Sequence, residues 1–253
     1  MASLQRRHAL VTGGGRGIGR AIVETLAATG MHVTALGRNE PVLKEMLRDG
    51  TIACYAVADV TDEREMVKEF ARVADHLGPI DILVANAGGA DSASFSKTTA
   101  NQFRHMFELN VMGVVHATRA VLDGMRERGA GRIVAIASTA GLKGYGYVSA
   151  YCAAKHAVVG LVRALAVETA QSGVTVNAVC PGYTDTEMVQ ESLAKISAKT
   201  GRSREDALAA MLKDSPLGRL VQPQEVAAAV LYLCSPEASA VTGTTLVVAG
   251  GEL

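Results

Sequence analysis

Hydrophobic residues along the chain gather in seven short runs, and longer helix-type stretches separate these runs. The runs are His8–Val11, His32–Leu36, Ile52–Val57, Ile80–Val84, Arg132–Ala137, Val174–Val179 and Thr244–Val248. Their length and their β-branched residues predict strands. Several runs are apolar on both faces, as parallel strands are when helices cover the sheet from either side. The pattern therefore predicts a doubly wound α/β sandwich with a seven-stranded parallel sheet.

One region, at approximately residues 183–215, is much longer than an ordinary connection between a strand and a helix. Apolar residues at helical spacing lie on either side of Gly201, and Ser203 with Asp206 resembles a capping box. We expect two short amphipathic helices that cover a cleft as a helical substrate lid; the alternative is a surface insertion packed on the core. Nothing else interrupts the alternation, so residues 1–253 are expected to form a single domain.

Composition narrows the class of protein. Hydrophobic residues make up 49% of the chain and charged residues 20%, which suits a folded core and argues against disorder. The 25 basic residues balance 25 acidic ones, so no overall field favours nucleic acid or an anionic membrane. The most apolar stretch, Ala157–Val167, is well short of the ~20 residues that span a bilayer. We therefore expect neither a nucleic-acid partner nor a membrane segment.

The cysteines and histidines carry no metal or disulfide pattern. The four cysteines are far apart, lack CxxC spacing and lie in apolar contexts, which suits reduced thiols in a cytoplasmic protein. The six histidines show no metal-ligand spacing. We expect no metal site.

A glycine-rich turn follows the first predicted strand and opens a helix-type stretch. It reads Thr12-Gly13-Gly14-Gly15-Arg16-Gly17-Ile18-Gly19. Glycines allow backbone angles closed to other residues, and they let a pyrophosphate approach the free N–H groups of the helix. The strict G-x-G-x-x-G register fails, because Ile18 or Ile22 stands where the third glycine would be. The turn alone leaves dinucleotide binding and a structural corner equally open.

A tyrosine and a lysine lie four residues apart in a helix-type stretch, at Tyr151 and Lys155. This spacing places both side chains on one face, about one turn apart. A nearby ammonium favours the phenolate, so we expect the pKa of Tyr151 to be lowered from its usual ~10. Ser138 ends the fifth strand, at the sheet edge where ligands bind, and its hydroxyl can hydrogen-bond a developing alkoxide. Taken alone, a tyrosine and a lysine at this spacing are usually ordinary helix-surface residues. Together with Ser138 they offer the groups that proton transfer during carbonyl reduction needs.

Taken in order, these motifs resemble the short-chain dehydrogenase/reductase family over essentially the whole chain. The glycine turn matches its cofactor turn, and Ser138-x(12)-Tyr151-x(3)-Lys155 matches its catalytic constellation, with Asn110 as the fourth member. The resemblance implies a Rossmann-type fold and an NAD(P)-dependent oxidoreductase acting on CH–OH groups, with Asn110, Ser138, Tyr151 and Lys155 as catalytic residues. It also implies that Asn110 holds a water that links Lys155 to solvent.

The resemblance extends to a cofactor site at the ends of several strands. Asn86-Ala87-Gly88 is similar to a second signature of the family, Asp59-Val60 to its adenine-contacting pair, and Pro181-Gly182 with Thr184 and Thr186 to its nicotinamide-side loop. The implied cofactor-binding residues are Gly13, Arg16, Gly17, Ile18, Gly19, Arg38, Asp59, Val60, Asn86, Ala87, Gly88, Tyr151, Lys155, Pro181, Gly182, Thr184 and Thr186.

The end of the second strand bears on the choice between NAD and NADP. It reads Leu36-Gly37-Arg38, without the acidic residue that holds the ribose in NAD-binding proteins. Arg38 and Arg16 can form a fork for a 2′-phosphate, a basic pair that the family uses for NADP. The alternative is that both arginines are solvated loop residues, and Glu40 lies close by. We expect NADP, with NAD as the alternative cofactor.

Within the family, the chain resembles 3-oxoacyl reductases and polyketide ketoreductases, on the stretches Gly131–Ser138, Ala154–His156 and Pro181–Tyr183. It lacks the histidine that 3-hydroxybutyrate dehydrogenases carry shortly after the catalytic serine, since Thr139-Ala140-Gly141 stands there. We expect NADPH-dependent reduction of a small-molecule carbonyl compound, a 3-oxoacyl thioester or a bulky ketone. The alternatives are an NAD-dependent hydroxy-acid or alcohol dehydrogenase of a degradative pathway and, remotely, a non-catalytic NADP-binding sensor.

Two surface features suggest partners. The stretch that carries Tyr151 leaves little polar face for water, and the family resemblance implies that its outer side is buried in a homotetramer. Basic residues around the expected lid would steer an anionic carrier, or form a solvated surface with the acids between them; they are Lys195, Lys199, Arg202, Arg204 and Lys213.

Overall fold

The computed structural model describes residues 4–253, and within this range seven parallel strands form one sheet. The strands are β1 (His8–Thr12), β2 (His32–Gly37), β3 (Cys54–Val57), β4 (Ile80–Ala85), β5 (Gly131–Ile136), β6 (Val174–Pro181) and β7 (Thr245–Val248). Their order in the sheet is β3-β2-β1-β4-β5-β6-β7, and every neighbouring pair is parallel. The predicted sheet is confirmed, with strand ends that differ by one or two residues.

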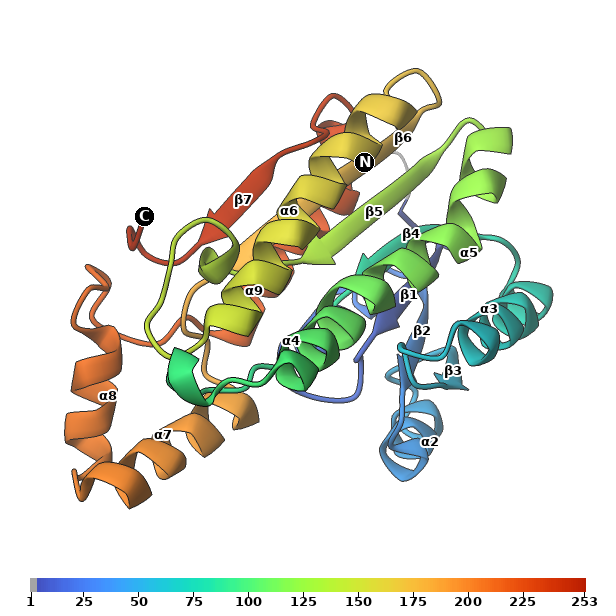
Figure 1. Ribbon diagram of the computed structural model, residues 1–253. Coiled ribbons are helices and arrows are strands. Elements are labelled where there is room, and N and C mark those ends of the chain that lie inside the picture. Colours follow the sequence, from blue (N-terminus) through green and yellow to red (C-terminus); the bar gives the residue numbers. More distant parts are fainter. Residues whose placement is uncertain (1–3) are drawn as a thin grey trace.

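Helices cover both faces of the sheet (Figure 1). They are α1 (Gly17–Ala27), α2 (Glu40–Arg48), α3 (Glu63–Leu77), α4 (Ala100–Phe107), α5 (Gly113–Glu127), α6 (Ser149–Thr169), α7 (Glu187–Thr200), α8 (Arg204–Leu212) and α9 (Pro223–Cys234). Side chains of β1 alternate between the two layers: Ala9 and Val11 pack in the core with α1, α2 and α9, and Leu10 packs in the core with α3, α5 and α6. The Rossmann-type sandwich is therefore confirmed.

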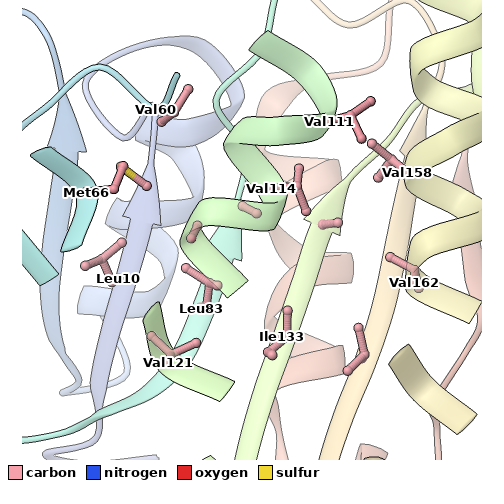
Figure 2. Packing of buried hydrophobic residues seen from close by; sticks show 14 of the residues in the cluster. Leu10, Val60, Met66, Leu83, Val111, Val114, Val121, Ile133, Val158 and Val162 are labelled. Atoms are coloured by element: carbon pink, nitrogen blue, oxygen red, sulfur yellow. The ribbon is translucent and has the colours of Figure 1, made fainter. Parts of the chain in front are cut away.

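The core beneath α5 and α6 combines branched aliphatic side chains with alanines and methionines (Figure 2). Leu83 and Ile133, from the adjacent strands β4 and β5, pack in one cluster with Val114 and Val121 of α5 and Val158 of α6. Each side chain of this size stabilises the fold by about 1.5–3 kcal/mol when fully buried. This packing holds α6, and the two residues of the expected proton relay that it carries, against the sheet.

Helix α6 is longer than the apolar stretch Ala157–Val167 that the sequence suggested. It has 21 residues with a mean hydropathy of 1.4, so by length and composition alone it is a candidate membrane span. Its buried face includes Ala154, Val158 and Val162, and it packs on β6. Burial in the core accounts for the apolar residues of this face, while 44% of the most apolar window of α6 is buried in all.

The segment at residues 183–215 contains the two helices that the sequence predicts. Helix α7 ends at Gly201, which has the left-handed φ of 71° that favours glycine. Ser203 caps α8, since its hydroxyl accepts a hydrogen bond of 3.0 Å from the Asp206 amide. Both helices project from one end of the molecule, in orange in Figure 1.

Candidate active site

A cavity of about 1500 Å³ follows the carboxyl ends of the strands, from the end of β2 to α7 and α8. Such an edge is where ligands bind in doubly wound sheets, because the loops there diverge at the point where the strand order reverses. Every site residue expected from the sequence lines this cavity: Gly13, Arg16, Gly17, Ile18, Gly19, Arg38, Asp59, Val60, Asn86, Ala87, Gly88, Asn110, Ser138, Tyr151, Lys155, Pro181, Gly182, Thr184 and Thr186. Residues up to 173 positions apart, Gly13 and Thr186, thus meet in one site.

The glycine turn is held by the segment that follows β4. The Asn86 side-chain amide donates to the carbonyl oxygens of Thr12 at 2.9 Å and Gly13 at 3.3 Å. The backbone amides of Asn86 and Ala87 both donate to Thr12 Oγ1, each at 3.0 Å. The two family signatures are therefore one structural unit, in which Asn86 shapes the turn.

Two glycines of the turn are required, one by close approach and one by its backbone angle. A Cβ at Gly19 would lie 2.1 Å from the Gly13 carbonyl oxygen, which is far inside contact distance. Gly13 itself has a φ of 65°. Helix α1 begins at Gly17, and no side chain caps it. Its first N–H groups are thus available to an anion such as a pyrophosphate.

Both expected 2′-phosphate ligands lie at the cavity, and both face an acid. Arg38 Nη1 lies 3.2 Å from Asp59 Oδ2, and Arg16 Nη1 lies 3.5 Å from Glu187 Oε2. The arginine side chains are 73% and 69% exposed, so these pairs are weak and an arriving anion can compete for them. Glu40, the acid next to this site, pairs with Lys44.

Lys155 is buried beneath Tyr151. Its ammonium donates a 2.8 Å hydrogen bond to the Ile136 carbonyl oxygen and lies 5.7 Å from the centre of the Tyr151 ring. The Tyr151 hydroxyl is hydrogen-bonded to Ser138, which caps the short turn after β5 by accepting a 3.1 Å hydrogen bond from the Ala140 amide. The serine, the tyrosine and the lysine of the motif are thus brought together at one point of the cavity wall.

The pKa of Tyr151 is not lowered, as the sequence led us to expect, but raised to about 12. Burial of the side chain disfavours the phenolate, and this effect outweighs the hydrogen bond from Ser138. Burial also lowers the pKa of Lys155 to about 8, because the ammonium loses its hydration. Both groups are therefore shifted toward their neutral forms.

Asn110 lies in a π-helical turn, Glu108–Met112, between α4 and α5. Its side chain is fully buried and donates to the carbonyl oxygens of Gly89 at 2.9 Å and Met106 at 3.0 Å. Its Oδ1 accepts a 3.2 Å hydrogen bond from the Gly89 amide. The side chain ties the segment after Asn86 to the helix, and π-turns of this kind are frequent at functional sites.

The substrate end of the cavity contains residues that the sequence reasoning missed. They are chiefly tyrosines and methionines: Tyr145, Tyr147, Tyr183, Met188 and Met211. Tyr145 and Tyr147 come from the glycine-rich stretch between Ser138 and Tyr151. Their position between two expected catalytic residues could have indicated that they line the substrate site. Tyr145 and Tyr183 make an edge-to-face pair with centroids 6.0 Å apart.

The cysteines and the possible metal ligands of the described chain also bear on the sequence-based expectations. In the range 4–253, no group of three or more His, Cys, Asp or Glu residues is placed to hold a metal. The cysteines Cys54, Cys152, Cys180 and Cys234 are free and buried, as expected. Burial raises the pKa of the Cys180 thiol to about 11 and that of Cys234 to about 12, so both stay protonated near neutral pH.

Comparisons with known proteins agree with this geometry. The profile of the family described as short chain dehydrogenase matches residues 7–197. The chain is 40% identical to a putative ketoacyl reductase of Streptomyces coelicolor, covering 99% of this chain and 98% of the relative. It is 42% identical to an acetoacetyl-CoA reductase of Rhizobium meliloti, covering 97% and 98%. A crystal structure of a variant of actinorhodin polyketide ketoreductase with NADPH superposes with a TM-score of 0.93 at 39% identity, covering 100% and 99%.

Proposed function

The chain belongs to the short-chain dehydrogenase family, and from that premise we propose that it reduces a 3-oxoacyl thioester or a related ketone with NADPH. One observation carries the proposal. The Ser138, Tyr151 and Lys155 cluster and the uncapped start of α1 line a single cavity. A proton donor and a site for a dinucleotide are therefore close enough to act on one substrate.

The residues divide the work of the reaction. Bound NADPH supplies a hydride to the carbonyl carbon. Tyr151 gives its proton to the carbonyl oxygen, and Ser138 hydrogen-bonds that oxygen while negative charge develops on it. The buried Lys155 ammonium lies beneath Tyr151 and restores its proton. Hydride and proton together turn the carbonyl into a secondary alcohol. Asn110 positions the helix beside these groups and, as the family resemblance suggests, links Lys155 to solvent.

The cavity has features that suit NADPH. Gly19 and Gly88 let the cavity wall pack closely, since a Cβ at Gly88 would lie 2.7 Å from Asn110 Oδ1 and one at Gly19 would lie 2.1 Å from the Gly13 carbonyl oxygen. Arg16 and Arg38 are exposed cations that line the cavity. Arg16 lies in the glycine turn before α1, and Arg38 follows β2, where NAD-binding proteins of this fold carry an acid. We therefore place the 2′-phosphate between these two arginines, with Asp59 and Val60 beside the adenine.

The charges at α7 and α8 support a thioester that carries a phosphate. Lys195, Lys199 and Arg202 line the cavity. Of the other cations that the sequence suggested, Arg204 donates to Gln190 and Lys213 pairs with Asp214. A phosphopantetheine arm ends in a phosphate group, and these cations would bind that phosphate. In this proposal α7 and α8 act as a lid.

The alternatives are weaker. An NAD-dependent degradative dehydrogenase would share every catalytic residue, but it does not account for the two arginines at the expected 2′-phosphate site. A non-catalytic NADP-binding sensor would not need Asn110, Ser138, Tyr151 and Lys155 together at one cavity. Both proteins named among the relatives, and the ketoreductase of known structure, are reductases.

The function is tested by assaying NADPH and NADH against acetoacetyl-CoA, its uncharged N-acetylcysteamine thioester, small oxo acids and bicyclic ketones. We expect NADPH to be preferred and acetoacetyl-CoA to have a lower KM than the uncharged thioester. Arg38→Asp should weaken the preference for NADPH by about tenfold or more, the effect of one charged hydrogen bond. An Arg38→Asp enzyme that kept the full preference would refute the 2′-phosphate site.

We propose that the enzyme acts as a homotetramer in the cytoplasm. The outer face of α6 exposes Ala153, Gly160, Ala164 and Val167, and the Val167 residue is 79% exposed. His156, Arg163 and Glu168 of the same helix are exposed as well, so this face offers both small apolar residues and charged partners to a second helix. Free, buried thiols suit a reducing compartment. Cell fractionation would test the location.

A further inference from the structure

The C-terminal end of the chain reaches the wall of the substrate cavity. The Glu252 carboxylate accepts a hydrogen bond from the Tyr145 hydroxyl, and Lys143 Nζ lies 3.2 Å from the same carboxylate oxygen. Lys143 also donates a 3.0 Å hydrogen bond to the Glu252 backbone carbonyl. The Tyr145 hydroxyl lies 2.7 Å from Thr139 Oγ1, in the residue next to Ser138. Glu252 is thus bonded to the loop that joins Ser138 to Tyr151.

This carboxylate is buried, unlike most acids of the chain. The Glu252 side chain is only 4% exposed, and the Lys143 side chain is 31% exposed. A buried carboxylate is costly unless ionic and hydrogen-bonding partners satisfy it. Lys143 and Tyr145 are those partners, and both come from one loop. Because the buried carboxylate needs both partners, the position of that loop depends on the position of Glu252.

The second carboxylate oxygen lies beside the loop that follows β6. A Cβ at Gly182 would lie 2.9 Å from Glu252 Oε2, so the glycine leaves the space that this oxygen occupies. The next residue, Tyr183, packs edge to face against Tyr145. Glu252 therefore lies where the loop after β5 meets the loop after β6, the two loops that carry the aromatic wall of the cavity.

We propose that Glu252 is a positioning residue that determines substrate specificity. By accepting from Tyr145 and pairing with Lys143, it holds the Tyr145 hydroxyl away from the cavity and fixes the ring edge to face with Tyr183. The substrate then meets an apolar aromatic wall of fixed position beside Tyr151. This inference rests on the proposed reduction of carbonyl compounds.

The test compares Glu252→Ala with wild type on a small substrate, ethyl acetoacetate, and a bulky one, 1-decalone. Loss of the carboxylate leaves Thr139 Oγ1 as the partner of the Tyr145 hydroxyl and removes the ion pair with Lys143, so the loop is held less firmly. We expect the ratio of kcat/KM values to shift by about tenfold in favour of the bulky ketone, through KM more than kcat. Glu252→Gln still accepts from Tyr145 and should restore most of the wild-type ratio. The Kd for NADPH, measured by fluorescence, should stay the same.

Two further variants separate positioning from general loss of structure. Leu253→Ala changes the neighbouring exposed residue and should leave both KM values unchanged. Tyr145→Phe removes the hydroxyl that Glu252 holds, so combining it with Glu252→Ala should add nothing to the effect of Glu252→Ala alone. An unchanged substrate ratio in Glu252→Ala, or full additivity in the double variant, would overturn the proposal. Failure of the proposed function itself would show earlier, in the wild-type assay.

Discussion

Burial decides the protonation state of the two residues at the centre of the site. Sequence spacing predicted that Lys155 lowers the pKa of Tyr151, whereas the structure raises that pKa to about 12. The lysine side chain is hydrogen-bonded to the Ile136 carbonyl, and its own pKa falls to about 8. A tyrosine that keeps its proton across the ordinary pH range suits the reductive direction, in which it is the donor.

Tyr151→Phe tests the donor directly. Without the hydroxyl, no proton reaches the carbonyl oxygen from this position, and we expect kcat to fall by about a thousandfold. Tyr147→Phe is the matched control, because Tyr147 also lines the cavity but is 73% exposed. Steady-state rates with NADPH and circular dichroism give the comparison. A folded Tyr151→Phe enzyme with near-normal turnover would refute the assignment.

The pH dependence of the reduction rate should follow the titration of Lys155. Below about pH 8 the lysine is charged, and above it the ammonium is lost. Tyr151 stays protonated until about pH 12, so it does not limit reduction in this range. We therefore expect kcat for reduction to be level at low pH and to fall as pH rises through about 8. Lys155→Met should have a lower rate without this fall; the same fall in the variant would contradict the assignment.

At the scale of elements, the turn between β1 and α1 shows how close packing shapes a ligand site. Asn86 bridges the turn to the end of β4, and Gly19 fits against the Gly13 carbonyl. A Cβ at Gly17 would lie 3.3 Å from Thr186 Cγ2, so the turn lies close against the loop after β6. The glycines thus allow the turn, the end of β4 and the loop after β6 to pack closely together.

Gly19→Ala and Gly15→Ala form a matched pair for this turn. The new Cβ at position 19 would lie 2.1 Å from the Gly13 oxygen, whereas at Gly15 the nearest atom is 3.5 Å away. We expect Gly19→Ala to raise the Kd for NADPH by at least about tenfold and to lower Tm, because the turn must move. Gly15→Ala should change both much less. Equal effects of the two substitutions would show that contact at Gly19 is not what shapes the site.

At the scale of the whole molecule, helix α6 joins the core to the site and to a proposed subunit interface. Its inner face includes Ala154, Val158 and Val162, and Lys155 is buried with them. On its outer face Val167 is exposed to water unless a second subunit covers it. Burial of this face in a tetramer would hold the proton relay from both sides.

Light scattering at micromolar concentration tests this assembly. We expect the mass of a tetramer for the wild type and a smaller species for Val167→Glu, because a charge placed in an apolar interface is costly to bury. Val67→Glu is the control, since Val67 is 57% exposed on α3, on a different helix. A monomeric wild type would contradict the proposal.

The chain sequence alone determined the sheet, the glycine turn and the Ser138, Tyr151 and Lys155 spacing, because strand and helix periodicity are local properties. Only the tertiary structure decided the pKa direction of Tyr151 and the pairing of Arg38 with Asp59, since burial and contact depend on how distant segments pack. Glu252 is the clearest case: it meets Lys143 and Tyr145 from more than a hundred residues away. Nothing near Glu252 in the sequence indicates this contact.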